Sequence, residues 1–322
     1  MSVLRLKLLS VVALSLLMSA CAGGESDRRL YVTNEFKDTV TVIDLRTDKP
    51  VATIDVGARP RGIKVSPDRR RVYVALGEDD AIGVIDTATN KVLEKIPAGE
   101  DPEAFDISPD GRFLYVSNEE ANTASLIDTA GRKVVATVRV GIEPEGVAVS
   151  PDGKWVYVSS ETSHTISVID TASFKVVATV LVGDRPRAIA FSPDGTRAYV
   201  TAEVGGTVSV MDAKTHKVLD TFSILRRDEK PMGVTVTPDG SKVYVTTGRG
   251  NTVAVIDARS QKVIQYIPVG KRVWGIAITP DGTRVYTANG VSGNVSVIDT
   301  ATDQVIATLP AGKGAWGVAI LW

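Results

Sequence analysis

Charged and aromatic side chains recur at one position of a sequence repeat, and they are the residues best suited to bind or transform a ligand. This position directly precedes a short strand-forming run and is occupied by Trp316, Arg61, Glu103, Glu145, Arg187, Met232 and Trp274. Arginine can hold a carboxylate through two parallel hydrogen bonds, and tryptophan offers a face on which a planar ring stacks. A second series of carboxylates follows another strand-forming run, at Glu35, Glu119, Glu161 and Glu203. Such carboxylates could also act as a general acid and base.

The case for an enzyme is otherwise weak at the level of sequence. The chain contains no nucleophile elbow, phosphate-binding loop, metal-spaced cluster or haem-attachment motif, so we predict no catalytic residue and no metal site. The two histidines, His164 and His216, fall in loops that are expected on opposite faces of the fold, so they are not expected to meet in one site. His164 could ligate a haem or a metal, but a polar loop tip is the more common role of such a residue.

The repeat itself is defined by two residue series. A tyrosine recurs at Tyr31, Tyr73, Tyr115, Tyr157, Tyr199, Tyr244 and Tyr286. An aspartate recurs at Asp44, Asp86, Asp128, Asp170, Asp212, Asp257 and Asp299. Both series advance by 42 residues, with a single step of 45 that adds the charged segment 226–230. A period near 42 with four strands per unit is typical of a β-propeller, so seven units predict a seven-bladed, all-β propeller.

One repeat, Glu143–Val180, shows how each unit is built. Strands are predicted at Gly146–Val149, Trp155–Ser159, Thr165–Asp170 and Lys175–Val180, from alternating Val and Ile. The first two strands are joined by a Ser-Pro-Asp-Gly turn, in which proline presets φ and glycine supplies positive φ. Four short antiparallel strands cannot bury both faces of their sheet alone, so each unit must stack against its neighbours.

The ends of the repeat array complement each other. The array begins at Arg28–Asn34 with a strand of the second type and finishes at Trp316–Leu321 with a strand of the first type. We therefore expect the last strand to complete the first blade, which would close the ring and remove a free sheet edge.

In this architecture the two candidate series share one face of the disc. Connections from fourth to first strands and from second to third strands emerge on the same side, and together they predict a funnel with a charged arc and an apolar arc. Such a funnel is typical of a ligand or partner site, although neighbouring arginines and glutamates could simply neutralise one another. Lys64 and Asp106 replace small residues in adjacent blades and are expected to pair inside the channel.

Residues 1–20 resemble a secretory signal peptide, with basic Arg5 and Lys7 before an apolar run. The segment Met18–Cys21 resembles the lipobox of bacterial lipoproteins, which implies lipidation of Cys21, residues 21–27 as a tether and residues 28–322 as the propeller. Ala22 after the cysteine implies an outer-membrane lipoprotein facing the periplasm. An ordinary cleaved signal with an incidental cysteine is the alternative. The formal net charge of −1 gives no indication of a nucleic-acid partner or of an anionic membrane surface.

The string Tyr31–Asn34, with the recurring Ser-Pro-Asp-Gly and Val-Ile-Asp-Thr motifs, resembles the YVTN-repeat propellers of bacteria and archaea. More narrowly, segments such as Arg59–Arg61, Glu143–Gly146 and Arg185–Arg187 resemble the propeller proteins associated with catabolism that depends on pyrroloquinoline quinone (PQQ). This resemblance implies a periplasmic protein that accompanies quinoprotein oxidation of alcohols or aldehydes, and it implies no established activity.

Two hypotheses follow for the function. In the first, a non-catalytic lipoprotein holds PQQ or a similar small molecule, or a periplasmic redox protein such as a quinoprotein dehydrogenase, at the funnel. In the second, the chain is an enzyme of the seven-bladed lactonase, lyase or quinoprotein type that uses carboxylates of the same face. We favour the first, because nothing in the sequence orients those carboxylates for catalysis.

Overall fold

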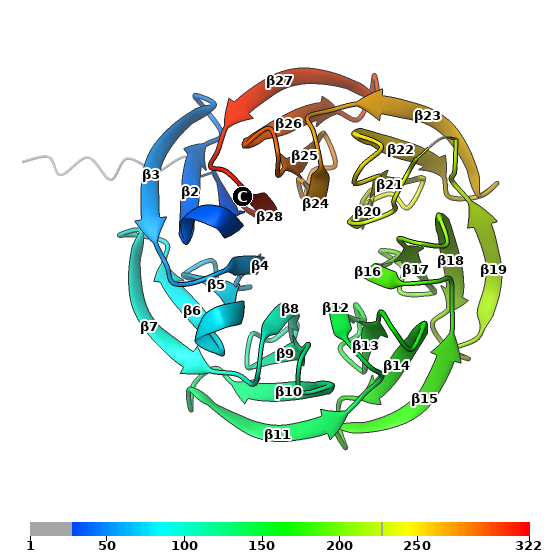
Figure 1. Ribbon diagram of the computed structural model, residues 1–322, viewed down its shortest axis with the longest axis horizontal. Helices are drawn as coiled ribbons and strands as arrows, with labels where there is room; N and C mark the ends of the chain where they lie inside the picture. The colour runs from blue at the N-terminus through cyan, green and yellow to red at the C-terminus, as the bar shows by residue number, and fades with distance from the viewer. Residues whose placement is uncertain (1–27, 227) are drawn as a thin grey trace, which may run out of the picture.

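The computed structural model describes residues 28–226 and 228–322, which form seven four-stranded antiparallel sheets around a central axis (Figure 1). The predicted seven-bladed, all-β propeller is thereby confirmed. The signal peptide, the tether and Cys21 lie outside the described residues. Within those residues, no helix has the length and the apolar composition of a membrane span.

Each blade runs from an inner first strand beside the axis to an outer fourth strand. The first blade comprises β28 (Ala315–Leu321), β1 (Arg29–Asn34), β2 (Thr39–Asp44) and β3 (Lys49–Asp55). The second comprises β4 (Pro60–Val65), β5 (Arg71–Leu76), β6 (Ala81–Asp86) and β7 (Lys91–Pro97). The third comprises β8 (Pro102–Ile107), β9 (Phe113–Asn118), β10 (Thr123–Asp128) and β11 (Lys133–Arg139). The fourth and fifth comprise β12 (Pro144–Val149), β13 (Trp155–Ser160), β14 (Thr165–Asp170) and β15 (Lys175–Leu181); β16 (Pro186–Phe191), β17 (Arg197–Ala202), β18 (Thr207–Asp212) and β19 (Val218–Ser223). The last two comprise β20 (Val234–Val236), β21 (Lys242–Thr246), β22 (Thr252–Asp257) and β23 (Lys262–Pro268); β24 (Val273–Ile278), β25 (Arg284–Asn289), β26 (Asn294–Asp299) and β27 (Gln304–Pro310).

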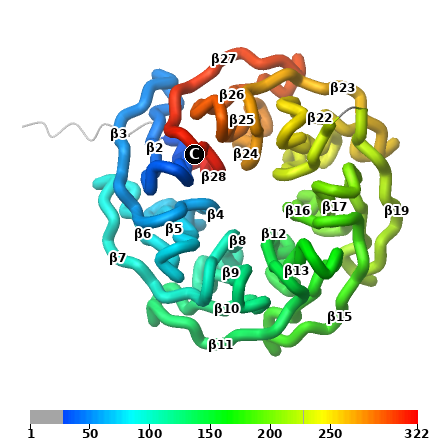
Figure 2. The backbone as a smooth tube through the Cα atoms, viewed as in Figure 1, coloured from blue at the N-terminus to red at the C-terminus, as the bar shows by residue number. Residues whose placement is uncertain are grey.

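The ring closes as the sequence predicts. The C-terminal strand β28 pairs antiparallel with β1, with Tyr31 opposite Ala319 and Val32 opposite Val318. Figure 2 shows the blue start and the red end of the chain in one blade. Ala315 and Leu321 of β28 are buried, so this strand belongs to the core as well as to the sheet.

The connections divide the disc into two faces. The funnel face carries the loops from second to third strands and from fourth to first strands, including two short 3-10 helices, η1 (Glu35–Lys37) and η2 (Gly77–Asp79). The turn face carries the turns from first to second strands and from third to fourth strands. In one such turn the Asp152 carboxylate accepts hydrogen bonds from the Ser150 hydroxyl (2.7 Å) and the Lys154 N–H (3.1 Å), which lower the pKa of Asp152.

Neighbouring blades are held together by the tyrosine series. The rings of Tyr31, Tyr157, Tyr244 and Tyr286 are fully buried between sheets. The Tyr31 hydroxyl donates to Asn90 Oδ1 (3.1 Å), and the Tyr244 hydroxyl donates to Asp303 Oδ1 (2.5 Å), in each case in the next blade. The repeating tyrosine is therefore a structural joint between blades, which explains why it recurs with the period of the fold.

Candidate functional site

The first strands of neighbouring blades approach each other so closely near the axis that only a small residue fits between them at one position of the repeat. A Cβ added at Gly146 would lie 2.0 Å from the carbonyl oxygen of Arg187, and one added at Gly275 would lie 2.4 Å from that of Trp316. These glycines directly follow residues of the candidate ring. The close approach of the strands brings the ring residues of adjacent blades within reach of one another.

Two arginines and four carboxylates of the first three blades form one ion-pair cluster. The Arg59 guanidinium donates to both carboxylate oxygens of Asp101 (2.6 and 2.5 Å) and to Glu103 (2.8 Å). Arg61 lies between Glu103, which it contacts, and Glu35, at 2.8 Å. Burial lowers the pKa of Arg61, but the charges of Glu103 and Glu145 outweigh this effect, and the pKa is raised overall.

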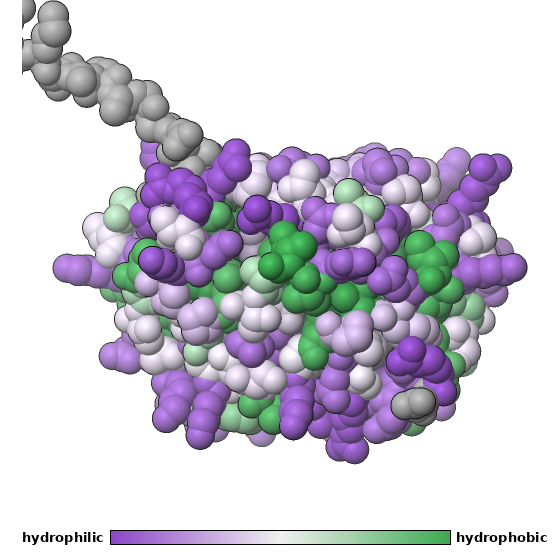
Figure 3. All heavy atoms as spheres, turned by 90° about the horizontal axis from the view of Figure 1, so that it is seen from above, coloured by the Kyte–Doolittle hydropathy of each residue, from purple (hydrophilic) through white to green (hydrophobic). Residues whose placement is uncertain are grey.

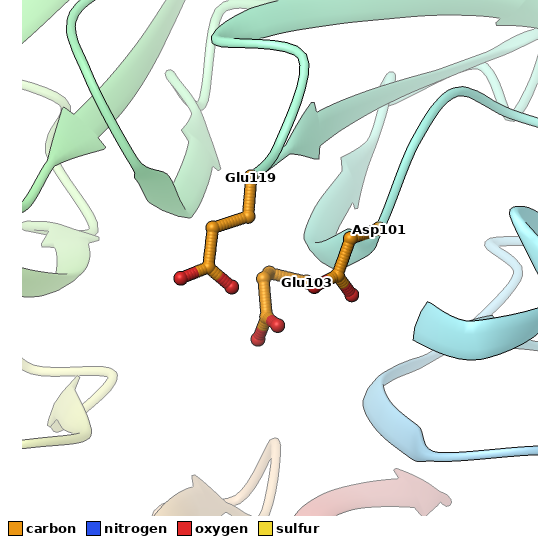
Figure 4. A group of neighbouring side chains, drawn as sticks. All are labelled: Asp101, Glu103 and Glu119. Carbon is orange, nitrogen blue, oxygen red and sulfur yellow. The ribbon is translucent and has the colours of Figure 1, made fainter.

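Three carboxylates of this cluster come close enough to resemble a cation site (Figure 4). Asp101, Glu103 and Glu119 each place an oxygen within 4.8 Å of the others. Arg59 already holds Asp101 and Glu103 and lies 3.8 Å from Glu119. Among the described residues, the Arg59 guanidinium therefore supplies the positive charge that faces these three carboxylates.

Glu103 is the most perturbed of these carboxyls. Its side chain is fully buried, and burial raises its pKa to about 7. Arg61 opposes the shift, while the neighbouring Glu119 adds to it. Glu103 thus titrates near neutral pH, although no solvent reaches its carboxyl group.

A second ion-pair cluster lies in the fourth and fifth blades. Arg187, only 7% exposed, forms an ion pair with Glu145 (2.9 Å) and also contacts Glu161. Arg185 lies 2.5 Å from Glu161 and 3.5 Å from Glu203. Burial raises the pKa of Glu145, and the charge of Arg187 opposes that shift.

A cavity of about 180 Å³ occupies the axis of the propeller. This is room for on the order of ten water molecules. Its wall includes five of the predicted site residues: Glu145, Arg187, Met232, Trp274 and Trp316. Lys64 also lines it and pairs with Asp106 at 3.1 Å, as expected from the sequence.

The aromatic arc of this wall is flanked by guanidinium groups. The Arg187 guanidinium carbon lies 5.8 Å from the ring centroid of Trp274, and that of Arg272 lies 4.6 Å from it. The Arg61 guanidinium carbon lies 5.8 Å from the ring of Trp316. A planar anion at this place would meet an aromatic face and positive charge together.

The remaining predicted site residues do not line this cavity. They are held in the two ion-pair clusters: Arg61, Glu103, Glu35, Glu119, Glu161 and Glu203. The two histidines are on opposite faces. His164 is an exposed loop residue that accepts a hydrogen bond from the Arg185 N–H (3.0 Å), and His216 lies in a turn beside the Tyr157 hydroxyl (2.8 Å).

From the sequence, Arg59 and Arg185 were expected only to reinforce the charge of the ring, and the structure makes them the bridges of the clusters. Their signal was present, because both lie two residues before a ring residue and next to a proline that fixes the loop. Both have positive φ, 53° and 57°. That conformation is uncommon for a residue with a side chain.

Comparison with known families agrees with this architecture. A family model described as a YNCE-like beta-propeller matches residues 17–149, and one described as a 7-bladed beta-propeller lactonase matches residues 171–305. The chain is a seven-bladed β-propeller. Each match spans less than half of the propeller chain. A comparison with curated proteins finds no match.

Solved structures include similar propellers from several bacteria. Hydrazine synthase of Kuenenia stuttgartiensis is 25% identical, with a TM-score of 0.74 over 81% of this chain and 89% of that chain. A putative 6-phosphogluconolactonase of Bacteroides uniformis is 17% identical, with a TM-score of 0.79 over 92% and 100%. A functionally unknown protein of Desulfotomaculum acetoxidans is 18% identical, with a TM-score of 0.79 over 91% and 98%. The last two likenesses concern the fold alone.

Proposed function

We propose that the protein is a non-catalytic binding protein, a periplasmic lipoprotein that holds a planar anionic molecule in the central cavity and accompanies quinoprotein oxidation. PQQ, which is planar and carries carboxylates, is the candidate ligand. The proposal combines the resemblance described above with the shape and charge of the cavity. The lipid anchor at Cys21 and the periplasmic location are part of the same proposal.

The observation that carries the proposal is the environment of Arg187. This arginine is nine-tenths buried, it lines the cavity, and its Nε–H has no hydrogen-bond acceptor among the described residues. A buried donor without an acceptor costs roughly 1–3 kcal/mol, so a ligand oxygen that accepted this hydrogen bond would recover that energy. Trp274 and Trp316, on the same wall, would stack on the ring of the ligand.

The positions of the carboxylates favour a binding protein over an enzyme. Glu103 and Glu161 are buried against arginines, and neither lines the cavity. Glu145 does line it, but it is paired with Arg187. Among the described residues, a substrate in the cavity would therefore meet one carboxylate, and that carboxylate is already engaged in an ion pair. The basic groups of the same wall, Lys64 and Arg187, are paired with carboxylates as well.

A thermal melt of the chain from Ala22 onward, with and without PQQ, tests the proposal. A ligand at a hundredfold excess over its Kd stabilises the folded state by about 2.7 kcal/mol. We expect a clear upward shift that is lost in the double variant Trp274→Ala and Trp316→Ala. Trp322→Ala is the matched control, because Trp322 lies against Arg28, outside the cavity. No shift with millimolar PQQ, or an equal shift in the double variant, would reject this ligand site.

A second candidate function is that of a lactone hydrolase. The observations that favour it are the lactonase model over residues 171–305 and the putative 6-phosphogluconolactonase among the similar structures. Glu145 would then be the general acid or base, because it lines the cavity and burial raises its pKa. Hydrolysis of 6-phosphogluconolactone, lost in Glu145→Gln and kept in Glu100→Gln, would establish this function in place of the first.

A further inference from the structure

The turn face is basic although the whole chain is nearly neutral. Arg28, Arg29 and the turns of this face, counted with the strand residue on either side of each turn, hold 20 lysines and arginines against 15 aspartates, a formal charge of +5. The other described residues hold 14 lysines and arginines against 21 aspartates and glutamates, a formal charge of −7. The charges are thus separated between the faces, which the overall net charge of the sequence conceals.

One series of lysines on this face is exposed to solvent. In five of the seven blades the fourth strand opens with an exposed lysine, and in a sixth an exposed lysine directly precedes that strand: Lys49, Lys91, Lys133, Lys175 and Lys262, with Lys217 before β19. None of these six makes an ion pair with another described residue. The aspartates of the same turns are instead held by hydrogen bonds inside the turns, as for Asp170, which accepts from the Ser173 N–H and hydroxyl. Lysines also discourage pairing at an edge strand, but that role does not require a charge difference between the faces.

The chain enters the fold from this same face. Arg29, the first residue of β1, pairs with Asp44, which begins a turn of the turn face. The carbonyl of Arg28 accepts a hydrogen bond from the Leu45 N–H (3.0 Å), which fixes the entry point. Only residues 22–27 separate Cys21 from Arg28, and the seven steps along the chain from Cys21 to Arg28 span at most about 25 Å.

We propose that the turn face docks on an anionic phospholipid surface, so that the funnel points away from the membrane. Anionic headgroups attract lysines and arginines within about a Debye length of the surface, which a short tether at this face would satisfy. Figure 3 shows hydrophilic side chains along both rims of the disc, with hydrophobic ones gathered between them, so the contact would be made through charge. The inference rests on the proposed lipid anchor only for the length of the tether. Charge and entry point are properties of the fold itself.

The test is sedimentation of the unlipidated chain from Ala22 onward with vesicles. Residues 28–322 close the ring without the preceding segment, so this form retains the whole propeller. The vesicles are of phosphatidylglycerol with phosphatidylethanolamine, or of phosphatidylcholine alone, at low and high salt. We expect binding to the anionic vesicles only, and its loss at high salt.

Two triple variants remove the same charge from opposite faces. The first is Lys91→Gln, Lys133→Gln and Lys175→Gln on the turn face. The control is Lys37→Gln, Arg139→Gln and Lys271→Gln on the funnel-face side, also exposed positions. A basic residue near an anionic surface changes the binding constant by about fivefold, so the first triple should weaken vesicle binding at least tenfold and the control should not.

Three results would overturn the inference: no binding to anionic vesicles at low salt, equal binding to neutral vesicles, or equal loss in both triple variants. Capture of the protein by heparin with no binding to vesicles would also overturn it and assign the face to a soluble polyanion. Failure of the proposed ligand site is a separate outcome, because it is read from the PQQ melt and involves residues of the other face.

Discussion

The buried carboxyl of Glu103 makes a prediction that can be worked through from the structure. Its pKa is raised from 4.5 to about 7, so the folded protein binds a proton more tightly than the unfolded chain does. The free energy of unfolding therefore falls as pH rises from about 4.5 through 7, and this contribution is fully lost above that window. The difference between these two pKa values corresponds to about 3 kcal/mol. The side chain is fully buried, so solvent screening takes little from this figure.

Glu103→Gln keeps the shape and hydrogen-bonding capacity of the protonated carboxyl and removes the titration. We expect it to match the parent at pH 4.5 and to become more stable than the parent by about 3 kcal/mol at pH 8, or roughly 5–10 °C in Tm. Thermal melts across this pH range measure the difference, and titrating groups whose pKa does not depend on Glu103 cancel because both proteins contain them. Glu100→Gln, at an exposed position, is the control for the loss of one formal charge. A difference between parent and Glu103→Gln that stays flat with pH would refute the reasoning.

The remaining predictions concern the fold. Deleting Ala315–Leu321 removes a strand whose burial of apolar surface contributes several kcal/mol, which is comparable with the whole stability of a domain. We therefore expect the shortened protein to show no cooperative melting transition in calorimetry. Gly146→Ala should cost at least about 2 kcal/mol, because its Cβ would meet the backbone of the next blade, whereas Gly131→Ala meets only the side chain of Asp128. A melting temperature equal to that of Gly131→Ala would contradict this packing. Tyr244→Phe should cost about 1–3 kcal/mol through the lost hydrogen bond between blades, and an unchanged unfolding midpoint would show that this bond is unimportant.

The architecture was predictable because each of its determinants is local and repeated. The strands predicted at Thr165–Asp170 and Lys175–Val180 appear as β14 and, one residue longer, as β15. Ring closure followed from the mismatch between the first and last strands. The pairing of Lys64 with Asp106 followed from two unusual residues at one repeat position in adjacent blades.

The side-chain arrangement at the funnel was only partly predictable. The order of charges around the ring could be predicted from the sequence. Which carboxylates would be buried could not, because that depends on how arginines from neighbouring loops fold over them. Glu103 is covered in this way by Arg59 and Arg61. The ring was expected either to bind a ligand or to be neutralised by its own ion pairs, and each expectation describes part of it. The arginines and carboxylates of the clusters largely neutralise one another, and the cavity wall keeps a donor without an acceptor at Arg187. The separation of charge between faces was likewise hidden in a net charge near zero.

The central claim is that the cavity binds a planar anion through Arg187 and the aromatic arc. A fluorescence titration of the chain from Ala22 onward with PQQ tests it most directly, because Trp274 and Trp316 lie in the wall of the cavity. We predict saturable quenching of tryptophan emission, with the apparent Kd unchanged in Trp322→Ala and raised at least tenfold in Trp274→Ala. Quenching that rises linearly without saturation, or the same Kd in Trp274→Ala as in the parent, would contradict the claim.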